Sequence, residues 1–94
     1  MKLSKDAIRS VLNHIIDNQK FDFDEGAMQK MDLTEIVKSL SDGSDDKDQE
    51  IACAIIRCIN EGFVYSNYPK AVWVAASISD ITLRGFMWLE NNNN

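Results

Sequence analysis

Residues 42–50 carry oxygen-bearing side chains at every second position, the spacing with which an EF-hand loop presents its first calcium ligands. These positions hold Asp42, Ser44, Asp46, Asp48 and Glu50. The loop also requires glycine at its sixth position and a bidentate glutamate at its twelfth, where this chain has Lys47 and Cys53. Because both the residue for the sharp turn and the decisive ligand are missing, the sequence predicts no metal site here.

His14 is the one histidine in the chain and the first candidate for a general base. Catalysis by histidine needs a hydroxyl, thiol or carboxylate held beside the ring, and no motif ties such a group to His14. Cys53 and Cys58 lie five residues apart, which places them about 140° apart around a helix axis, so they cannot bridge each other. Both are predicted to be small packing residues. No phosphate-binding glycine loop or zinc-binding spacing occurs, so we expect no catalysis, no cofactor and no small-molecule substrate.

The bulk composition is that of one ordinary globular domain. The chain has 94 residues, of which 45% are hydrophobic and 27% charged, and its net charge is -5. Nucleic-acid-binding domains usually carry a basic stripe, so an acidic balance disfavours contact with phosphates. The longest apolar run, residues 71–76, is far shorter than the roughly 20 residues of a membrane-spanning helix. With a polar N-terminal stretch that has no signal-peptide pattern, the sequence predicts a cytoplasmic protein without membrane contact.

The first third of the chain predicts a helix followed by an extended arm. Ser4 is a good N-cap, and apolar residues between Ile8 and Ile16 recur at the spacing of one helical face. This pattern ends at Asn18. In residues 19–30 two phenylalanines alternate with two aspartates, which indicates a brief extended arm with one turn.

Two further helices follow, and the second of them is predicted to be the centre of the core. Asp32 and Glu35 have the spacing of a capping box for the first of these helices, and Gly43 follows its end. The next helix opens with acidic side chains, which suit the positive end of a helix dipole. Its segment 51–59 has a single charge, so we expect a buried rod that ends at Gly62.

The period of the sequence changes after this helix. Residues 63–65 and 72–78 are rich in β-forming side chains and predict a β-hairpin, with a turn at residues 66–70. Thr82 is the expected N-cap of a fourth helix. Gly85 lies inside this helix, where glycine costs about 1 kcal/mol relative to alanine, so we expect it to mark a close approach to another backbone.

The order of these elements is that of a winged-helix domain. The predicted fold class is α+β and winged-helix-like, with three helices, a β-hairpin wing and a C-terminal helix. The helix pair that precedes the hairpin would be the helix-turn-helix unit. Residues 1–90 are expected to form a single domain, and the four asparagines at residues 91–94 a polar disordered tail.

Three segments resemble proteins that phages and prophages encode. Residues 5–12 (KDAIRSVL) are similar to the start of those proteins, and residues 59–64 (INEGFV) look like the segment that leads into their wing. Residues 78–89 (ISDITLRGFMWL) are similar to their C-terminal ending. The resemblance is to the YjcQ-like group and related phage-encoded domains of unknown function. It implies a winged-helix fold and a phage or prophage context, and it transfers no catalytic or binding residue.

A winged-helix fold is typical of DNA-binding proteins, which use the third helix and the wing. The residues that favour this function are Gln49, Arg57 and Asn60 on the helix and Lys70 at the wing. The same helix, however, opens with several acidic side chains, and these repel phosphate. A winged-helix DNA-binding transcriptional regulator is therefore the alternative hypothesis.

Aromatic residues in the last third of the chain favour a protein partner or a homodimer. Trp73 alternates away from Val72 and Val74, and Trp88 falls outside the main apolar stripe of the last helix. At least one tryptophan is therefore expected at the surface, although both could instead close the core. Together with Tyr68, the two tryptophans are the predicted protein interface. The leading hypothesis is a phage-related, non-catalytic interaction module that acts through protein contacts.

Overall fold

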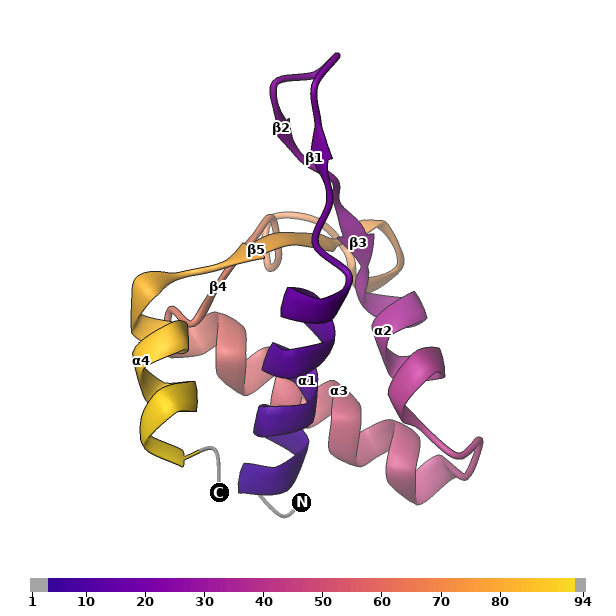
Figure 1. The fold of residues 1–94 in the computed structure, drawn as a ribbon. Helices are drawn as coiled ribbons and strands as arrows, with labels where there is room; N and C mark the ends of the chain where they lie inside the picture. Colours follow the sequence, from indigo (N-terminus) through magenta and orange to yellow (C-terminus); the bar gives the residue numbers. More distant parts are fainter. Residues whose placement is uncertain (1–3, 93–94) are drawn as a thin grey trace.

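Four helices and two small antiparallel sheets make up the α+β fold of residues 4–92, the part of the chain that the computed structural model describes (Figure 1). The elements in chain order are α1 (Lys5–Asp17), β1 (Phe21–Asp22), β2 (Ala27–Met28), β3 (Met31–Asp32), α2 (Leu33–Leu40), α3 (Asp45–Asn60), β4 (Val64–Ser66), the 3-10 helix η1 (Trp73–Ala75), β5 (Ser77–Ile81) and α4 (Leu83–Asn92). The predicted α+β class is confirmed. None of the described helices is long and apolar enough to cross a membrane.

The first helix, α1, begins as predicted because the Ser4 side chain caps it. The Ser4 hydroxyl oxygen accepts a hydrogen bond from the Ala7 amide at 3.0 Å, and Asn18 is the C-cap. The buried face of the helix consists of Ala7, Ile8, Val11, Leu12 and Ile15. This face follows the predicted helical spacing, and α1 contacts α2, α3, α4 and β5.

The predicted central helix, α3, contributes one face to the core, but Arg57 is exposed and Ile56 partly exposed on its other side, so the predicted rod is buried on one side only. The Ser44 hydroxyl oxygen caps this helix by accepting a hydrogen bond from the Lys47 amide at 3.2 Å. The buried residues of α3 are Ile51, Ala54, Ile55 and Cys58. Because α1, α2 and β4 all contact α3, this helix holds the other elements together.

At its C-terminal end, α3 stops in a Schellman turn around Gly62. Gly62 has a φ of 75°, a left-handed conformation that glycine adopts without strain. Its amide donates to the Ile59 carbonyl at 3.1 Å, and the next amide, that of Phe63, donates to the Cys58 carbonyl at 2.9 Å. The predicted stop at glycine is confirmed. The turn directs Phe63 into the core, where this side chain is buried.

The last helix, α4, sits directly on that turn. The Thr82 hydroxyl donates to the Gly62 carbonyl at 2.6 Å, and the Thr82 amide donates to the Phe63 carbonyl at 2.8 Å. The same hydroxyl accepts a hydrogen bond from the Gly85 amide at 3.1 Å and so caps the helix as predicted. A Cβ atom on residue 85 would overlap the Phe63 carbonyl oxygen. The close backbone approach that the glycine predicted is therefore confirmed.

The larger sheet has the strand order β3-β5-β4, and all its pairs are antiparallel. The central strand, β5, pairs Ile78 with Met31 of β3 and Ile81 with Val64 of β4. Its Ile78 is fully buried, so the sheet closes one side of the core over α1 and α3. The predicted hairpin is thus present as β4 and β5, with different limits.

The second strand of this hairpin begins at Ser77, and not at residue 72 as predicted. Residues 73–75 instead form the 3-10 helix η1. The side-chain oxygen of Asn67 accepts a hydrogen bond from the Ser77 amide at 2.8 Å, which closes the loop between the strands. The apolar run at 72–74 has the propensity of a strand, but β4 ends at Ser66 and offers it no partner.

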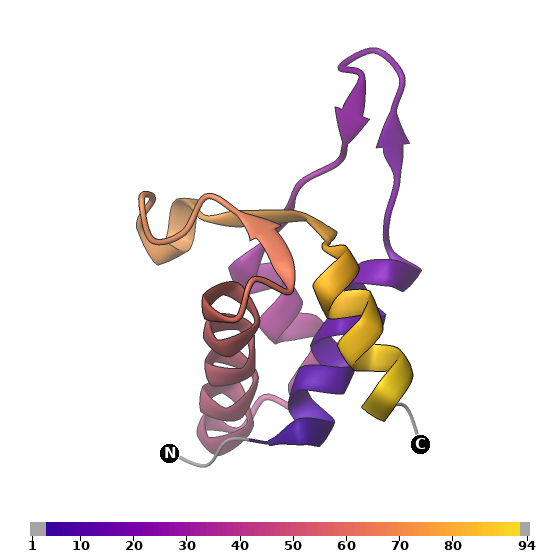
Figure 2. The same cartoon turned by 90° about the vertical axis from the view of Figure 1, so that its left-hand side faces the viewer.

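The predicted extended arm is a second hairpin, β1–β2, which projects from the body of the protein (Figures 1 and 2). Phe21 pairs with Met28, and Asp22 pairs with Ala27. The turn is held by the Asp22 side chain, whose Oδ1 accepts hydrogen bonds from two amides of the turn at 2.9 and 3.2 Å. Gly26 supplies the left-handed conformation that the turn requires, with a φ of 68°.

Two smaller predictions at helix ends are wrong. Asp32 is the N-cap of α2 but makes no side-chain capping bond, because it is part of β3 and pairs with Ser77. At the C-terminus, α4 includes Asn91 and Asn92, which were expected in the disordered tail. The Asn92 amide group donates to the Trp88 carbonyl at 2.8 Å, one turn earlier. The rest of the predicted tail, residues 93 and 94, lies outside the described residues.

Candidate functional site

The outer face of α3 carries three of the residues predicted to contact DNA. Gln49, Arg57 and Asn60 are exposed there, and Lys70 is exposed in the loop between β4 and β5. The structure therefore leaves all four accessible. However, the Arg57 guanidinium lies 3.6 Å from a carboxylate oxygen of Glu61, one turn later on the chain. Part of its positive charge is thus matched by a neighbour, which weakens the attraction it offers to a phosphate.

The first turn of α3 has the wrong sign of charge for contact with phosphate. Asp45 and Asp46 are exposed there. The only cation nearby on the helix, Lys47, places its ammonium 2.8 Å from the Glu50 carboxylate. The hydrogen bond to Glu50 raises the pKa of Lys47, so this charge stays engaged at the helix surface. The N-terminal half of α3 therefore presents acidic side chains to its surroundings.

The loop between β4 and β5, residues 67–76, is the predicted wing; it presents apolar side chains, and they are not the ones predicted. Val72 and Val74 are 69% and 79% exposed. Trp73, between them, turns inward and packs against the core, and its ring lies 6.1 Å from that of Tyr68 in an edge-to-face arrangement. Trp73 and Tyr68 are therefore partly buried, and the two valines form the outer surface of the wing.

These two regions lie on the same side of the molecule, toward the left in Figure 2. We call them together the α3–wing face, made up of Asp45, Asp46, Gln49, Ile56, Val72 and Val74. Its exposed surface combines acidic groups at one end with apolar groups at the other. Such a combination suits an interface with another protein, because the apolar side chains can be covered and the acidic groups can orient a basic partner.

The outer side of α4 is also apolar. Leu83, Phe86 and Met87 are exposed on this helix. Trp88, the residue predicted to be at the interface, is instead partly buried, and its ring lies 5.7 Å from that of Phe63. Both tryptophans therefore pack against the core, as the more conservative of the two sequence interpretations held.

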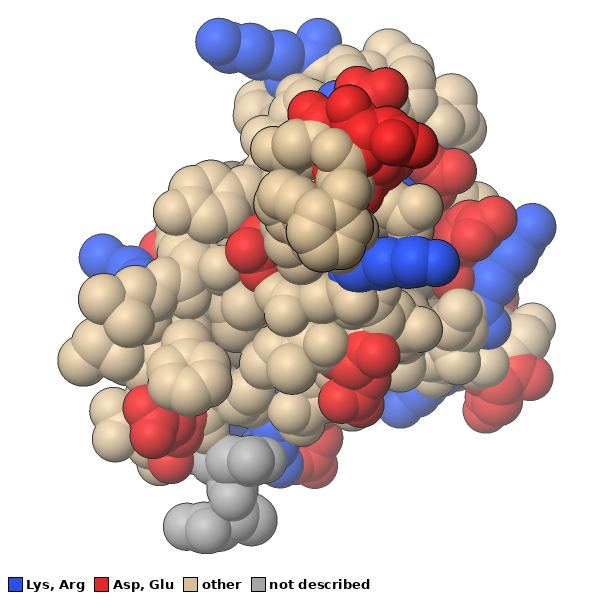
Figure 3. Space-filling view, turned by 45° about the horizontal axis from the view of Figure 1, so that its top comes forward, with Lys and Arg blue, Asp and Glu red and all other residues tan. Residues whose placement is uncertain are grey.

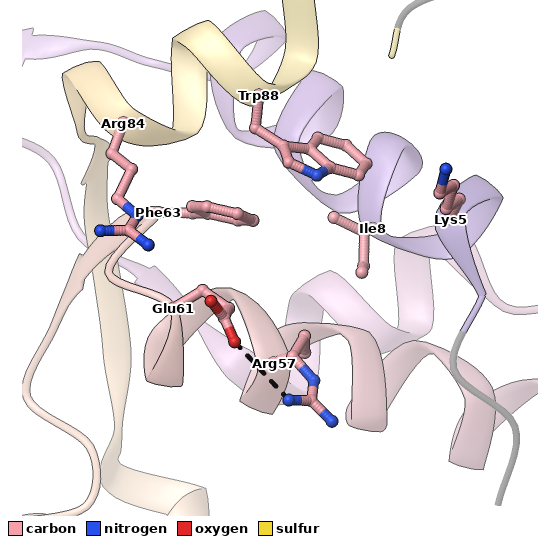
Figure 4. A pocket seen from close by; sticks show the side chains of 7 residues that line it. All are labelled: Lys5, Ile8, Arg57, Glu61, Phe63, Arg84 and Trp88. Carbon is pink, nitrogen blue, oxygen red and sulfur yellow. Dashed lines mark ion pairs between the residues drawn. The ribbon is translucent and has the colours of Figure 1, made fainter. Parts of the chain in front are cut away.

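A groove between α1, α3 and α4 gathers positive charge in this acidic protein (Figure 4). Its volume is about 400 Å³, and it is lined by Lys5, Ile8, Arg57, Glu61, Phe63, Arg84 and Trp88. The apolar side chains among them form the floor, and the three cations stand around it. A site with an apolar floor and a few charged groups at its rim is suited to a ligand that is both apolar and anionic. We call it the cationic groove.

His14 lines a smaller hollow of about 250 Å³ between α1 and α2, together with Asp32, Glu35 and Ser39. The ring Nδ1 of His14 lies 3.4 Å from the side-chain nitrogen of Asn18, one turn later on the helix. A general base needs a nucleophile or an orienting carboxylate within hydrogen-bond reach. The hollow thus brings polar groups near His14. Within residues 4–92, however, no hydrogen bond joins the His14 ring to an acidic side chain or a hydroxyl.

The two cysteines have different environments on α3. Cys58 is fully buried in the core, and this burial raises the pKa of its thiol to about 12. It is therefore protonated at neutral pH and poorly reactive. Cys53 is partly exposed on the opposite side of the helix. Within residues 4–92, histidine, cysteine and acidic side chains form no group of three or more that could hold a metal ion.

The cationic groove could not be predicted from the sequence. Lys5 and Arg84 lie at opposite ends of the chain, and Arg57 comes from its middle. No spacing or motif connects the three, and only the packing of α4 beside α1 brings them around one hollow.

Comparisons of the chain with protein-family models, with curated proteins and with solved structures find no match in any of the three. The resemblance to phage-encoded winged-helix proteins therefore stays a prediction, and the function is argued from the surfaces described above.

Proposed function

We propose that this protein is a winged-helix-like, non-catalytic module that acts through contacts with another protein. The order of its elements supports the winged-helix assignment, with α2 and α3 as the helix-turn-helix pair and β4 and β5 as the wing. The phage or prophage context that the sequence resemblance implies belongs to the same proposal.

The observation that carries the proposal is the character of the α3–wing face. A helix-turn-helix protein that binds DNA presents its third helix to the major groove and gains affinity from cations that meet phosphates. Here the first turn of that helix has Asp45 and Asp46 exposed. The wing exposes Val72 and Val74, which gain free energy when an apolar surface covers them.

These properties describe the partner in chemical terms. The two aspartates favour approach of a basic protein surface, because complementary charge accelerates encounter and orients the two molecules. The two exposed valines require an apolar patch beside that basic surface. We therefore expect a partner protein with a basic surface at one end of its interface and an apolar patch at the other.

Site-specific photocrosslinking tests this proposal in cells that naturally make the protein. A photoreactive amino acid is placed at Val74, on the α3–wing face, and at Ser10, which is exposed on α1 and serves as the matched control. We expect a discrete protein adduct from position 74 and none from position 10. Equal adducts from both positions, or none from position 74, would contradict the proposal.

Binding of DNA is the second candidate, because Gln49, Arg57, Asn60 and Lys70 are all exposed as this function requires. It is tested by fluorescence anisotropy with a mixed-sequence DNA duplex over a series of salt concentrations. The proposal of a protein partner predicts no binding at low salt. Binding that weakens linearly with the logarithm of salt, and that is lost when Arg57 and Lys70 are replaced with alanine, would establish the alternative.

A further inference from the structure

The tip of the β1–β2 hairpin exposes a pair of aromatic rings. The Phe23 side chain is 88% exposed and that of Phe21 is 44% exposed, and the two ring centroids lie 5.1 Å apart in an edge-to-face arrangement. We call this pair the aromatic knob. Large exposed aromatic side chains are characteristic of residues that dominate protein interfaces, because covering them removes much apolar area from water.

Carboxylates accompany the aromatic knob. Asp24 and Glu25 follow Phe23 directly and are exposed in the turn. Asp22 stabilises the turn, because its carboxylate accepts hydrogen bonds from the backbone amides of both these residues. Figure 3, in which the hairpin comes toward the viewer, shows acidic side chains gathered beside uncharged surface at this end of the molecule. The hairpin tip is therefore both aromatic and acidic.

The cationic groove has the complementary properties. Its floor includes Phe63 and Trp88, whose rings lie 5.7 Å apart. Lys5 and Arg84 stand near it with Arg57, whose charge is partly matched by Glu61, so the groove has a net positive charge (Figure 4). Its volume of about 400 Å³ is of the size that holds a small ligand or a few side chains. Aromatic rings can pack on the floor while carboxylates meet the cations, which satisfies both classes of group at once.

A hairpin cannot reach the groove of its own chain. Lys5 and Ile8 lie in the first turns of α1, whereas the hairpin follows the last turn of this helix. Thirteen helical residues span about 20 Å, and the hairpin extends further away from the groove (Figure 1). Contact between the two surfaces therefore has to occur between two molecules.

We propose that the β1–β2 hairpin of one copy of this protein inserts its aromatic knob into the cationic groove of a second copy. The inference rests on the proposed function as a protein-interaction module and names a partner, a second copy of the chain, for a surface other than the α3–wing face. Asp24 and Glu25 of the inserted hairpin pair with the cations around the groove. Phe23 covers the floor.

The proposed contact joins two different surfaces, so it is heterologous. A pair of molecules joined in this way keeps an unused hairpin on one molecule and an unused groove on the other. Repetition of the contact produces a ring if the rotation closes and an open chain if it does not. Two variants that each lack one of the surfaces should therefore complement each other, because the mixture contains one intact hairpin and one intact groove.

Size-exclusion chromatography with light scattering tests the proposal on the full chain. The wild-type protein should gain mass as its concentration rises from micromolar toward millimolar, as expected for a small interface, and lose it at high salt. Phe23→Ser removes the knob, and Arg84→Glu reverses a charge at the groove. Both residues are exposed, so both variants should fold. Each variant alone should remain monomeric, with a dissociation constant raised at least about 30-fold, the effect of losing one interface hot spot.

The mixture of the two variants is the decisive measurement. It should form a dimer and nothing larger, because neither free end of that dimer has a working surface. Val74→Ser removes a similarly exposed apolar side chain from the α3–wing face, and it should leave self-association unchanged.

A wild-type protein that stays monomeric at all concentrations would overturn the proposal, as would self-association that survives Phe23→Ser. Failure of the mixture to form a dimer would do the same. None of these results would affect the crosslinks expected from position 74, so the failure of this inference and that of the proposed function remain distinguishable.

Discussion

Replacing Gly85 with alanine is the sharpest test of how α4 is seated on the rest of the protein. Helix propensity alone predicts that the change stabilises the fold by about 1 kcal/mol, because alanine is favoured over glycine inside a helix. The tertiary structure predicts the opposite sign. A Cβ atom at residue 85 would overlap the Phe63 carbonyl oxygen, and it would lie 2.9 Å from Cγ1 of Ile81 and 3.0 Å from Cβ of Phe63. The overlapped atom belongs to the backbone, so no side-chain rotation relieves the contact.

The magnitude follows from what α4 has to give up. Overpacking of this kind costs about 1 to 3 kcal/mol. If the helix moves away, it also weakens the hydrogen bonds from the Thr82 amide and hydroxyl to the Phe63 and Gly62 carbonyls, each worth about 1 kcal/mol. After the propensity gain is subtracted, we expect the free energy of unfolding to fall by about 2 to 4 kcal/mol. For a domain of this size the melting temperature should fall by roughly 10 to 25 °C.

Urea unfolding, followed by tryptophan fluorescence and by far-ultraviolet circular dichroism, measures this loss. Trp88 lies on α4 and its ring is 5.7 Å from that of Phe63, so fluorescence reports on the contact itself. Asn91→Ala is the matched control, because this residue is exposed on the same helix. Its effect should stay within about 0.5 kcal/mol. If Gly85→Ala were as stable as the wild type, or more stable, the proposed seating of α4 would be refuted.

Four further predictions use the same unfolding assay or a thiol reagent. Ile55→Ala, at a fully buried position of α3, should lower the free energy of unfolding by about 2 to 5 kcal/mol. The control, Ile56→Ala, changes a partly exposed side chain and should lower it clearly less. Equal losses would contradict the burial of Ile55. Phe23→Ser should change stability by less than about 0.5 kcal/mol under conditions in which the protein is monomeric, since this side chain is almost fully exposed, and a larger loss would show that the hairpin packs on the body. Cys58 should resist alkylation in the folded protein while Cys53 reacts, as read by mass spectrometry, and rapid native labelling of Cys58 would refute its burial. Burial raises the pKa of Cys58 from 9.0 to about 12. The contribution of the protonated thiol to the free energy of unfolding is therefore fully present below pH 9 and is lost as the pH rises from 9 toward 12. Urea unfolding measured across that pH range tests this loss.

Predictions that depend on neighbours along the chain were reliable. The caps at Ser4 and Thr82 and the glycine stop at Gly62 involve bonds that reach five residues or fewer within their helix, so the local sequence contains all the information they require. The apolar segment 51–59 was correctly placed against the core, but the structure buries only one of its faces, because no element among the described residues packs over the other. Gly85 predicted a close contact because glycine is unfavourable inside a helix, although the sequence could not name the residue in contact with it.

Predictions that depend on a distant partner were less reliable. Residues 72–74 have strand propensity, but a strand exists only where another strand pairs with it, and β4 ends before it can do so. Asp32 has the type and position of a capping residue, yet its backbone pairs with Ser77 in the sheet, and the extended strand runs into the helix without a side-chain bond. The competing contact in each case lies far away in the sequence.

By itself, the sequence determined the four helices, the presence of a hairpin and the acidic start of α3, because helical periodicity, turn residues and charge are local properties. The tertiary structure decided which apolar residues are covered. It turned Trp73 and Trp88 inward, left Phe23 at the end of a projecting hairpin, and brought Lys5, Arg57 and Arg84 around one groove. The exposure of a side chain depends on which other elements pack over it, and that depends on contacts between residues that the order of the chain keeps far apart.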